Sequence, residues 1–357
     1  MGLSPDRTRS RSGALPQRAV ITGASGFVGG HLAEHLRASG DLVLGCSPDG
    51  QWIEACKPPI AGQIELVPFD VGAPDGLPPE TRRTLERFRP TCIYHLAALS
   101  VPEDCGESQP TALATAINVD GTARVLGLAA ALPSKPRVLF ISTSHVYAPL
   151  RPEAPRLDEN APLGPRRGYG RSKLAAEEEV RRAIGQHGCD ALIARAFQHT
   201  GPRQGKRMML LQWAEQFLEN AAGPVEIYTR DAHIDLTDVR DIVRAYRLLM
   251  LRGRSGEVYN VGSGLVRSSG QIFAMLHQLA DPRREIVEIH PGFKQDPIAD
   301  ISRLFAATGW QPRIPIQQTV ADTWAWRLGN QVRGDRAGPT GETPDRGAGT
   351  FRFKKSA

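Results

Sequence analysis

Residues 18–32 read Arg18-Ala-Val-Ile-Thr-Gly-Ala-Ser-Gly-Phe-Val-Gly-Gly-His-Leu32, and this stretch decides the fold. Its apolar start predicts a buried strand over 18–22, and the pattern after it predicts a helix over 27–38. Three evenly spaced glycines between the two permit a tight turn, close approach of the backbone to a pyrophosphate, and tight packing of the helix on the strand. The helix N-terminus adds free N–H groups and a partial positive charge. This turn is therefore predicted to bind a dinucleotide through Gly23, Ser25, Gly26, Phe27, Val28 and Gly29.

Beyond this stretch, predicted strands alternate with predicted helices. Apolar runs predict strands at 42–46, 64–69, 91–96, 137–142 and 191–195, and helical patterns occupy 79–88, 110–132 and 169–186. Such alternation is typical of an α/β protein with a doubly wound parallel sheet of the Rossmann type. After Arg195 the elements become shorter and mixed, with helices at 206–220, 239–251 and 268–279 and strands at 225–228 and 257–261. They predict a smaller C-terminal lobe that binds the substrate.

The chain divides into four parts on this basis. We expect a disordered tail over 1–17, a Rossmann domain over 18–200, and a lobe over 201–327 that is mainly substrate-binding and interleaved with the Rossmann domain. Residues 328–357 are rich in Gly, Pro, Arg and Thr without an apolar period, which predicts a second disordered tail.

Composition narrows the class of protein. The 357 residues are 41% hydrophobic, which is typical of a globular protein with a sizeable core, and we find neither a long uncharged apolar stretch nor a secretory signal. Residues 1–18 carry a net charge of +3 and residues 327–357 a net charge of +4, against +6 for the whole chain, so the folded part is close to neutral. We therefore expect a cytoplasmic protein with no membrane partner and no specific nucleic-acid partner. The five cysteines form no CxxC pair, which predicts reduced, mostly buried thiols and no metal site.

A second motif, Tyr169-Gly-Arg-Ser-Lys173, opens the helix predicted at 169–186. Its spacing places the phenol and the ammonium group on one helix face. A lysine there stabilises the phenolate and is expected to lower the pKa of the tyrosine toward the working range. Thr143 directly follows a strand, at the sheet edge where ligands bind. Thr143, Tyr169 and Lys173 are therefore the predicted catalytic residues.

The end of the second strand predicts the choice of cofactor. An acidic residue there bonds the ribose of NAD and repels the 2′-phosphate of NADP. Here the position holds Ser47, which is uncharged and can donate to a phosphate, so the sequence favours NADP over NAD. Asp70, after the third strand, either accepts a hydrogen bond from the adenine amino group or forms a turn.

The chain resembles the extended short-chain dehydrogenases, the family of sugar-nucleotide epimerases, dehydratases and reductases. The resemblance covers residues 18–327 and is carried by TGASGFVGGHL, YHLAALS, INVDGTARVL, ISTSHVY, YGRSK and GEVYNVGSG. The strings ARAFQHTGPRQ, DLTDVRDIVRAY and TGWQPRIPIQQTVADTW look most like GDP-6-deoxy-D-mannose reductases. That group reduces the 4-keto group of GDP-4-dehydro-6-deoxy-D-mannose to give GDP-D-rhamnose.

The resemblance implies a role for each motif residue. Thr143 polarises the sugar carbonyl, Tyr169 protonates its oxygen, and Lys173 holds the nicotinamide ribose. Asn118 supports the active-site helix and is counted with the cofactor site. The resemblance also implies a homodimer that pairs through the helices beginning near Pro110 and Tyr169. The cofactor groove is further expected to be lined by Val71, Leu96, Ala97 and Ala98.

The expected substrate site departs from the family pattern at three positions. His145, beside Ser144, stands where related 4,6-dehydratases have a glutamate, which argues against dehydration. Gln198 replaces an asparagine. Ile234 replaces an arginine that would bind the diphosphate. The residues expected to contact the substrate are Ser144, His145, Gln198, His199, Arg203, Arg207 and His233. Of these, Arg203, Arg207 or His233 is expected to take the place of the arginine that is missing at position 234.

Three functions remain open from the sequence. The first is an NAD(P)H-dependent reductase of a nucleotide-4-keto-6-deoxyhexose. The second is a 4-epimerase or 4,6-dehydratase that regenerates its own cofactor. The third is a non-catalytic dinucleotide-binding sensor, for which the catalytic motif would be unnecessary.

Overall fold

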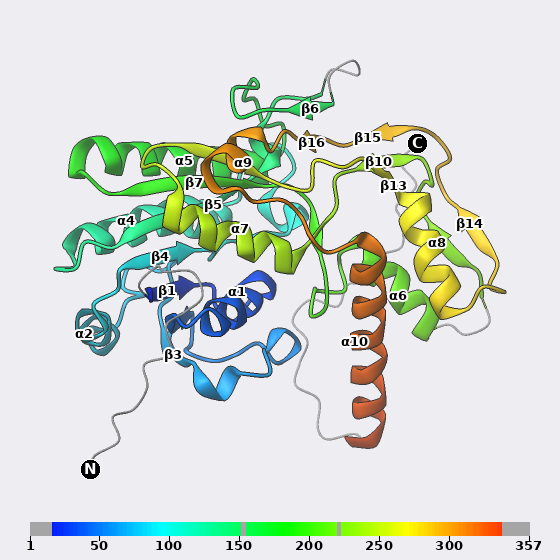
Figure 1. The fold of residues 1–357 in the computed structure, drawn as a ribbon, viewed down its shortest axis with the longest axis horizontal. Coiled ribbons are helices and arrows are strands. Elements are labelled where there is room, and N and C mark those ends of the chain that lie inside the picture. The colour runs from blue at the N-terminus through cyan, green and yellow to red at the C-terminus, as the bar shows by residue number, and fades with distance from the viewer. Residues whose placement is uncertain (1–15, 151–154, 220–222, 338–357) are drawn as a thin grey trace, which may run out of the picture.

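The computed structural model describes residues 16–150, 155–219 and 223–337, and its centre is a seven-stranded parallel sheet (Figure 1). Neighbouring strands pair in parallel throughout this sheet. Its order is β12 (Val258–Val261), β7 (Ala191–Ala196), β5 (Arg137–Thr143), β4 (Cys92–His95), β1 (Arg18–Thr22), β2 (Leu42–Ser47) and β3 (Glu65–Pro68). The predicted α/β Rossmann class is confirmed.

Helices cover both faces of the sheet, which is why its strands read as nearly continuous apolar runs. All six residues of β7 are buried, as are all four of β4. One face packs on α1 (Phe27–Ala38), α7 (Val239–Arg252) and α9 (Ser302–Thr308). The other face packs on α2 (Pro79–Phe88), α4 (Gly121–Ala131) and α5 (Gly168–His187).

The strand order reverses between β1 and β4. From β1 the chain moves outward to β2 and β3, and then returns to β4 on the other side of β1. In such sheets a crevice opens beyond the carboxyl ends of the strands at the reversal. The glycine turn, the residues after β4 and the end of β5 all lie at this edge.

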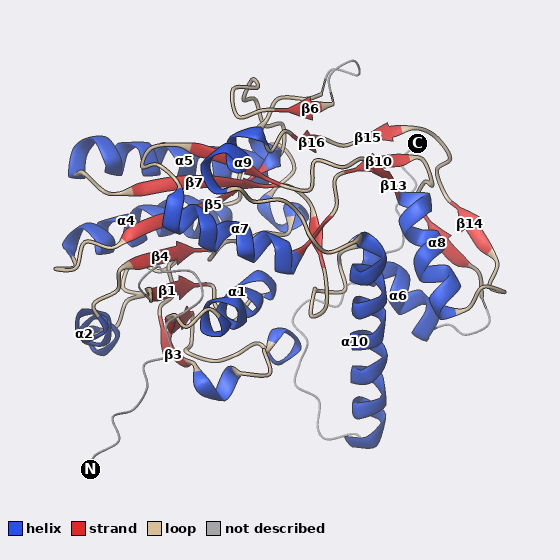
Figure 2. Cartoon of the chain, viewed as in Figure 1, coloured by secondary structure: helices blue, strands red, loops and turns tan. Residues whose placement is uncertain are grey.

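A second core lies beside the sheet and belongs to the smaller lobe (Figure 2). Aromatic rings of Trp213, Phe217, Phe273 and Trp324 pack together within it. These rings come from α6 (Met209–Glu219), α8 (Ser269–Ala280) and α10 (Ile316–Ala337). Short strands complete the lobe: β9 (Val225–Ile227), β10 (Ala232–Ile234), β13 (Arg267–Ser268), β14 (Ile286–Glu288) and β15 (Lys294–Gln295).

Further short strand pairs connect the lobe to the Rossmann part. They are β6 (Arg156–Leu157) with β16 (Ile298–Ala299), and β8 (His199–Thr200) with β11 (Thr237–Asp238). Two elements from within 201–327 belong to the large sheet: β12 is its edge strand, and α7 packs on one face.

The structure corrects the predicted C-terminal tail. Helix α10 was not predicted, and it continues to Ala337, so disorder from residue 328 is wrong for 328–337. Trp324 anchors the helix in the lobe core, and no proline interrupts the chain between Pro315 and Pro339, so helix propagation costs little. The predicted disordered tail over 1–17 is likewise wrong at Gln17, which is buried and whose backbone N–H donates to the Asp41 carboxylate at 2.9 Å. Residues 338–357 and 1–15, where the remaining tail predictions fall, lie outside the described residues.

The helix predicted over 110–132 is not a single α-helix. It consists of α3 (Ala112–Ala114), a π-helical segment (Thr115–Asp120) and α4.

None of the helices in the described ranges has the length and apolar character needed to cross a membrane.

Candidate active site

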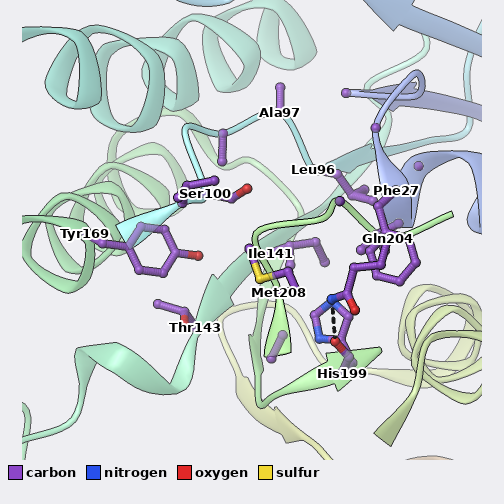
Figure 3. Close-up of a pocket in the computed structure, with 18 of the residues that line it drawn as sticks. Phe27, Leu96, Ala97, Ser100, Ile141, Thr143, Tyr169, His199, Gln204 and Met208 are labelled. Carbon is purple, nitrogen blue, oxygen red and sulfur yellow. Dashed lines mark hydrogen bonds between the residues drawn. The ribbon is translucent and has the colours of Figure 1, made fainter. Parts of the chain in front are cut away.

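A cavity of about 770 Å³ opens at the reversal of strand order (Figure 3). Its volume and its largely apolar walls are typical of a small-molecule site. It brings together most of the residues selected from the sequence: Gly23, Ser25, Gly26, Phe27, Val28, Gly29, Ser47, Asp70, Val71, Leu96, Ala97, Ala98, Thr143, Ser144, His145, Tyr169, Lys173, Gln198, His199 and Arg207.

The glycine turn is shaped to admit a pyrophosphate. Gly23 adopts φ +72°, and a Cβ there would lie 2.8 Å from the backbone nitrogen of Ala97. A Cβ on Gly29 would lie 2.2 Å from the Gly23 carbonyl oxygen. Gly26 precedes α1 without any side-chain cap, so the N-terminus of the helix is open to a ligand. These residues fit a bound dinucleotide.

Tyr169 and Thr143 face one another across one wall of the cavity (Figure 3). Burial raises the pKa of Tyr169 to about 12, and a hydrogen bond with the Thr143 side chain offsets only part of this effect. The sequence had predicted that Lys173 lowers the pKa of Tyr169, but the net shift is upward because the effect of burial is larger. The phenol keeps its proton at neutral pH because removing it would leave a desolvated phenolate.

Lys173 lies one helical turn after Tyr169 and is buried. Its ammonium nitrogen lies 4.2 Å from the centre of the Phe140 ring. Burial lowers the pKa of Lys173 to about 7, although the negative charge of Glu177 opposes the shift. This lysine is thus poised to change charge near neutral pH.

Asn118 supports the active-site helix and does not itself line the cavity. Its amide donates to the hydroxyl of Ser172 at 2.9 Å, and that hydroxyl donates to the Tyr169 carbonyl oxygen at 2.8 Å. The Asn118 carbonyl oxygen accepts from the backbone of Leu99 at 2.8 Å. The π-helical segment carries this buried amide, which binds the loop after β4 to α5. The predicted supporting role fits this geometry, and direct contact with the cofactor does not.

Ser47 and Asp70, which the sequence predicts to contact the adenosine of the cofactor, both line the cavity. The Ser47 hydroxyl donates to the carbonyl oxygen of Gln51 at 3.0 Å, so its proton is already used within the chain. The Asp70 carboxylate accepts from the backbone of Gly72 at 2.9 Å and also lines the cavity, so both roles considered for it remain compatible.

The expected substrate end contains two histidines. His145 lies edge-on to Tyr169, with ring centres 5.5 Å apart. His199 stacks on Phe27 at 6.2 Å, and its carbonyl oxygen accepts from Gln204 at 3.0 Å (Figure 3). Burial lowers the pKa of both histidines, which favours their neutral forms. The Gln198 amide lines the cavity and donates to Asp296 at 2.9 Å.

Two predicted substrate residues lie elsewhere. Arg203 is buried away from the cavity lining and bonds Glu34 and His31, both on α1. Glu34 is far from Arg203 in the sequence, so their ion pair fastens the loop after β8 to helix α1. His233 also lies outside the lining, where it pairs with Asp231 at 3.2 Å. The structure thus places both residues outside the cavity lining, where the sequence had expected them.

Ile234, the position of the missing arginine, is buried in the core of the smaller lobe. Of the three predicted substitutes, only Arg207 lines the cavity, where it pairs with Asp104 at 2.8 Å. Other lining residues were not predicted from the sequence, among them Glu103, Gln204, Met208, Met209, Leu236 and Tyr246. Gln204 ends the quoted string ARAFQHTGPRQ, and Leu236 and Tyr246 lie in the quoted string DLTDVRDIVRAY, so the resemblance offered a signal for these three. The others carry no local signal.

The cysteines are free, and Cys46, Cys92 and Cys105 are buried as expected. In the described ranges, no group of three or more His, Cys, Asp or Glu side chains is arranged to hold a metal ion.

Comparison with known proteins agrees with the fold and the cavity. The chain is 29% identical to the GDP-6-deoxy-D-mannose reductase of Pseudomonas aeruginosa, over 86% of this chain and 95% of the relative. It is 27% identical to a dTDP-glucose 4,6-dehydratase of Xanthomonas campestris, over 88% and 93%. The solved structure of RMD from Pseudomonas aeruginosa complexed with NADPH superposes with a TM-score of 0.71 at 29% identity, covering 88% of this chain and 99% of that one.

The model of the NAD dependent epimerase/dehydratase family matches residues 19–262. This range spans most of the chain and includes the glycine turn, Thr143, Tyr169 and Lys173. The chain belongs to the NAD-dependent epimerase/dehydratase family.

Proposed function

We propose that this protein is an NAD(P)H-dependent reductase of the 4-keto group of a nucleotide-4-keto-6-deoxyhexose. The first candidate substrate is GDP-4-dehydro-6-deoxy-D-mannose, with GDP-D-rhamnose as the product. The observation that carries the proposal is the placement of Tyr169 and Thr143, which face one another in the cavity, with Lys173 one helical turn after Tyr169. Reduction of a carbonyl consumes a proton at the oxygen, and a phenol can donate it; because burial raises the pKa of Tyr169 to about 12, the donation needs a cation that stabilises the phenolate.

Each catalytic residue has one task in this proposal. The reduced nicotinamide, when bound, supplies a hydride to the sugar carbon. Thr143 donates a hydrogen bond to the ketone oxygen and polarises it, and Tyr169 transfers its phenolic proton to the same oxygen. Lys173 stabilises the phenolate left by that transfer, since a cation one turn away favours the charged form. A pKa near 7 lets the lysine carry that charge when it is needed.

The cofactor would be held by the open edge of the sheet. The glycine turn and the N-terminus of α1 would bind the pyrophosphate. Asp70 and Val71 would contact the adenine, and the segment Leu96–Ala98 would line the groove toward the nicotinamide. Among the residues that line the cavity, the only Arg and Lys are Arg207, which is paired with Asp104, and Lys173, which lies against Phe140, so none is assigned to a 2′-phosphate. An uncharged Ser47 would not repel one either, so we infer use of both cofactors in place of the NADP preference expected from the sequence.

The nucleotide and sugar are proposed from similarity and cavity size. The first-named relative is called a GDP-6-deoxy-D-mannose reductase, and its alignment spans 95% of its length. Ser144, His145, Gln198, His199 and Arg207 would contact the substrate. The proposal further includes a cytoplasmic homodimer that pairs through α4 and α5.

One observation supports a second function. His145 lies edge-on to Tyr169 in the same cavity, so a second proton donor or acceptor stands beside the first. A 4-epimerase, which oxidises and then reduces its substrate, would have a use for it, whereas a 4,6-dehydratase would have to use this histidine in place of the glutamate of related dehydratases. The dehydratase relative is almost as similar to this chain as the reductase.

A single assay distinguishes these functions. Purified protein is mixed either with 4-keto-6-deoxyhexoses or with the parent 4-hydroxy hexoses, each linked to GDP, dTDP or UDP, and the loss of NADH or NADPH absorbance is followed with product analysis. A reductase consumes one reduced cofactor per sugar converted. Conversion without net loss of cofactor would assign the epimerase or dehydratase instead, and no conversion of any sugar nucleotide would leave a dinucleotide-binding protein.

A further inference from the structure

Arg207 is the one guanidinium among the residues that line the cavity. The other lining cation, Lys173, is buried against Phe140 beside Tyr169. The nucleotide-sugar substrate of the proposed function carries a diphosphate, for which a guanidinium is a strong bidentate partner. Ile234 supplies none, because it is apolar and buried in the lobe core.

Arg207 already has a partner in the structure. Its guanidinium donates three hydrogen bonds to the carboxylate of Asp104, at 2.8, 3.1 and 3.1 Å. Glu103, which also lines the cavity, lies 4.0 Å away. The cation is therefore occupied by a carboxylate at the same wall where an anionic substrate would enter.

The two partners come from different parts of the fold. Asp104 lies in a 3-10 turn (Pro102–Cys105) held firmly near the start of α5. The Cys105 thiol donates to the carbonyl oxygen of Leu99 at 3.2 Å, and a Cβ on Gly168 would lie 2.3 Å from the Cys105 carbonyl oxygen. Arg207 stands in the loop before α6 of the smaller lobe. The ion pair thus bridges the Rossmann part and the smaller lobe across the cavity.

The pair is easily exchanged. Arg207 is 44% exposed and Asp104 is 42% exposed, and an ion pair between half-exposed side chains contributes little to stability. A phosphate oxygen offers the guanidinium the same bidentate geometry with more negative charge. If Arg207 moved away from Asp104, the Asp104 carboxylate would be solvated by water, and no buried charge would be left without a partner.

We propose that Arg207 changes partners, from Asp104 in the ligand-free protein to the diphosphate of the bound nucleotide sugar. Asp104 then acts as a competing anion that sets the affinity for the substrate. This inference rests on the proposed function, because it requires a nucleoside diphosphate in the cavity.

The test measures the Kd of GDP, UDP and dTDP by calorimetry with the full-length protein. Arg207→Gln should weaken binding of the preferred diphosphate at least about tenfold. Asp104→Asn should tighten it about threefold or more, because it frees the guanidinium. In the Arg207→Gln background, Asp104→Asn should no longer tighten binding, because its effect passes through Arg207. Arg230→Gln is the matched control, since Arg230 is half exposed near Glu288 and lies outside the cavity lining.

The outcomes separate this inference from the function on which it rests. A pair that only holds the two lobes together would make both single variants bind more weakly, and that result would overturn the exchange. Equal binding by the wild type and Arg207→Gln would overturn it too, while the proposed function would stand. If the wild type bound none of the three diphosphates, the proposed function and the inference would fall together.

Discussion

The carboxylate of Glu177 accepts two hydrogen bonds from the guanidinium of Arg195, at 2.9 and 2.8 Å, and both side chains are buried. The Ser142 hydroxyl donates to the same carboxylate at 2.6 Å. Burial would raise the pKa of Glu177, but the hydrogen bonds and charge of Arg195 outweigh it, and the net pKa lies below its ordinary value. The pair fastens α5 to β5 and β7 one turn beyond Lys173, so it positions the catalytic helix.

Glu177→Ala should therefore be strongly destabilising. Removing the carboxylate leaves the buried Arg195 charge without its main partner, a change that typically costs about 3–5 kcal/mol. Urea denaturation followed by circular dichroism measures this loss. Glu178→Ala is the matched control on the next residue of α5, where the ion pair with Arg181 is largely exposed and worth less than about 1 kcal/mol. Equal losses in the two variants would contradict the role given to the buried pair.

Tyr169→Phe should abolish reduction and leave cofactor binding nearly intact. The variant keeps the ring and loses the proton donor, so turnover should fall by about 10²–10⁴-fold while the Kd of NADH or NADPH changes by less than about threefold. Tyr259→Phe, which removes a buried hydroxyl outside the cavity, serves as the control and should retain turnover. Substantial residual activity in Tyr169→Phe would remove the phenol from the mechanism.

Gly29→Ala should weaken dinucleotide binding by more than about tenfold. The new Cβ would lie 2.7 Å from the Cα of Ala24 as well as 2.2 Å from the Gly23 carbonyl oxygen, so the turn itself must shift. Fluorescence titration with NADH measures the effect. Gly185→Ala on α5 is the control, because its Cβ would meet nothing within 4 Å, and replacing an exposed helical glycine should raise stability by about 1 kcal/mol. An unchanged Kd in Gly29→Ala would show that the turn does not bind the cofactor.

The buried Lys173 should make stability depend on pH. Its pKa falls from 10.5 to about 7 on folding, so between these values the unfolded chain binds a proton that the folded protein does not. The free energy of unfolding therefore rises with pH across this window, by at most about 1.4 kcal/mol per pH unit from this group. Lys173→Met should be most stabilising below pH 7, and its advantage should shrink as the pH approaches 10.5. The difference is measured by urea denaturation of both cofactor-free proteins at several pH values; a constant difference would contradict the shift.

The local signals in the sequence were sufficient for the glycine turn and its helix. The predicted helix 27–38 coincides with the observed helix Phe27–Ala38. Both ends have a signal in the neighbouring sequence: the glycine turn precedes the helix, and Gly40 follows it. The helix predicted over 110–132 failed in its middle. Its π-helical segment turns Asn118 toward Leu99 and Ser172, which are far from it in the sequence. The spacing of apolar residues, from which the helix was predicted, does not reveal such a contact.

Side-chain direction was the main limit at the site. Arg203 was expected in the cavity, yet its guanidinium turns to Glu34, which is 169 residues away in the sequence. The pKa of Tyr169 was expected to fall because the nearby lysine was visible in the motif, while the burial that raises it depends on the whole fold. Arg207 was one of three candidates, and only the packed structure separates it from the others.

Cofactor choice is the last point that a single substitution can test. Ser47 is uncharged and its hydroxyl is bonded to Gln51, so the wild type should bind NADH and NADPH with Kd values within about tenfold of each other. Ser47→Asp should weaken NADPH binding by more than about tenfold, because a carboxylate repels the 2′-phosphate, whereas NADH, which lacks that phosphate, is the control within the same variant. Fluorescence titration gives both Kd values. A parallel loss of both cofactors would instead indicate that the buried position does not tolerate a carboxylate, and an unchanged preference would mean that the ribose does not lie at the end of β2.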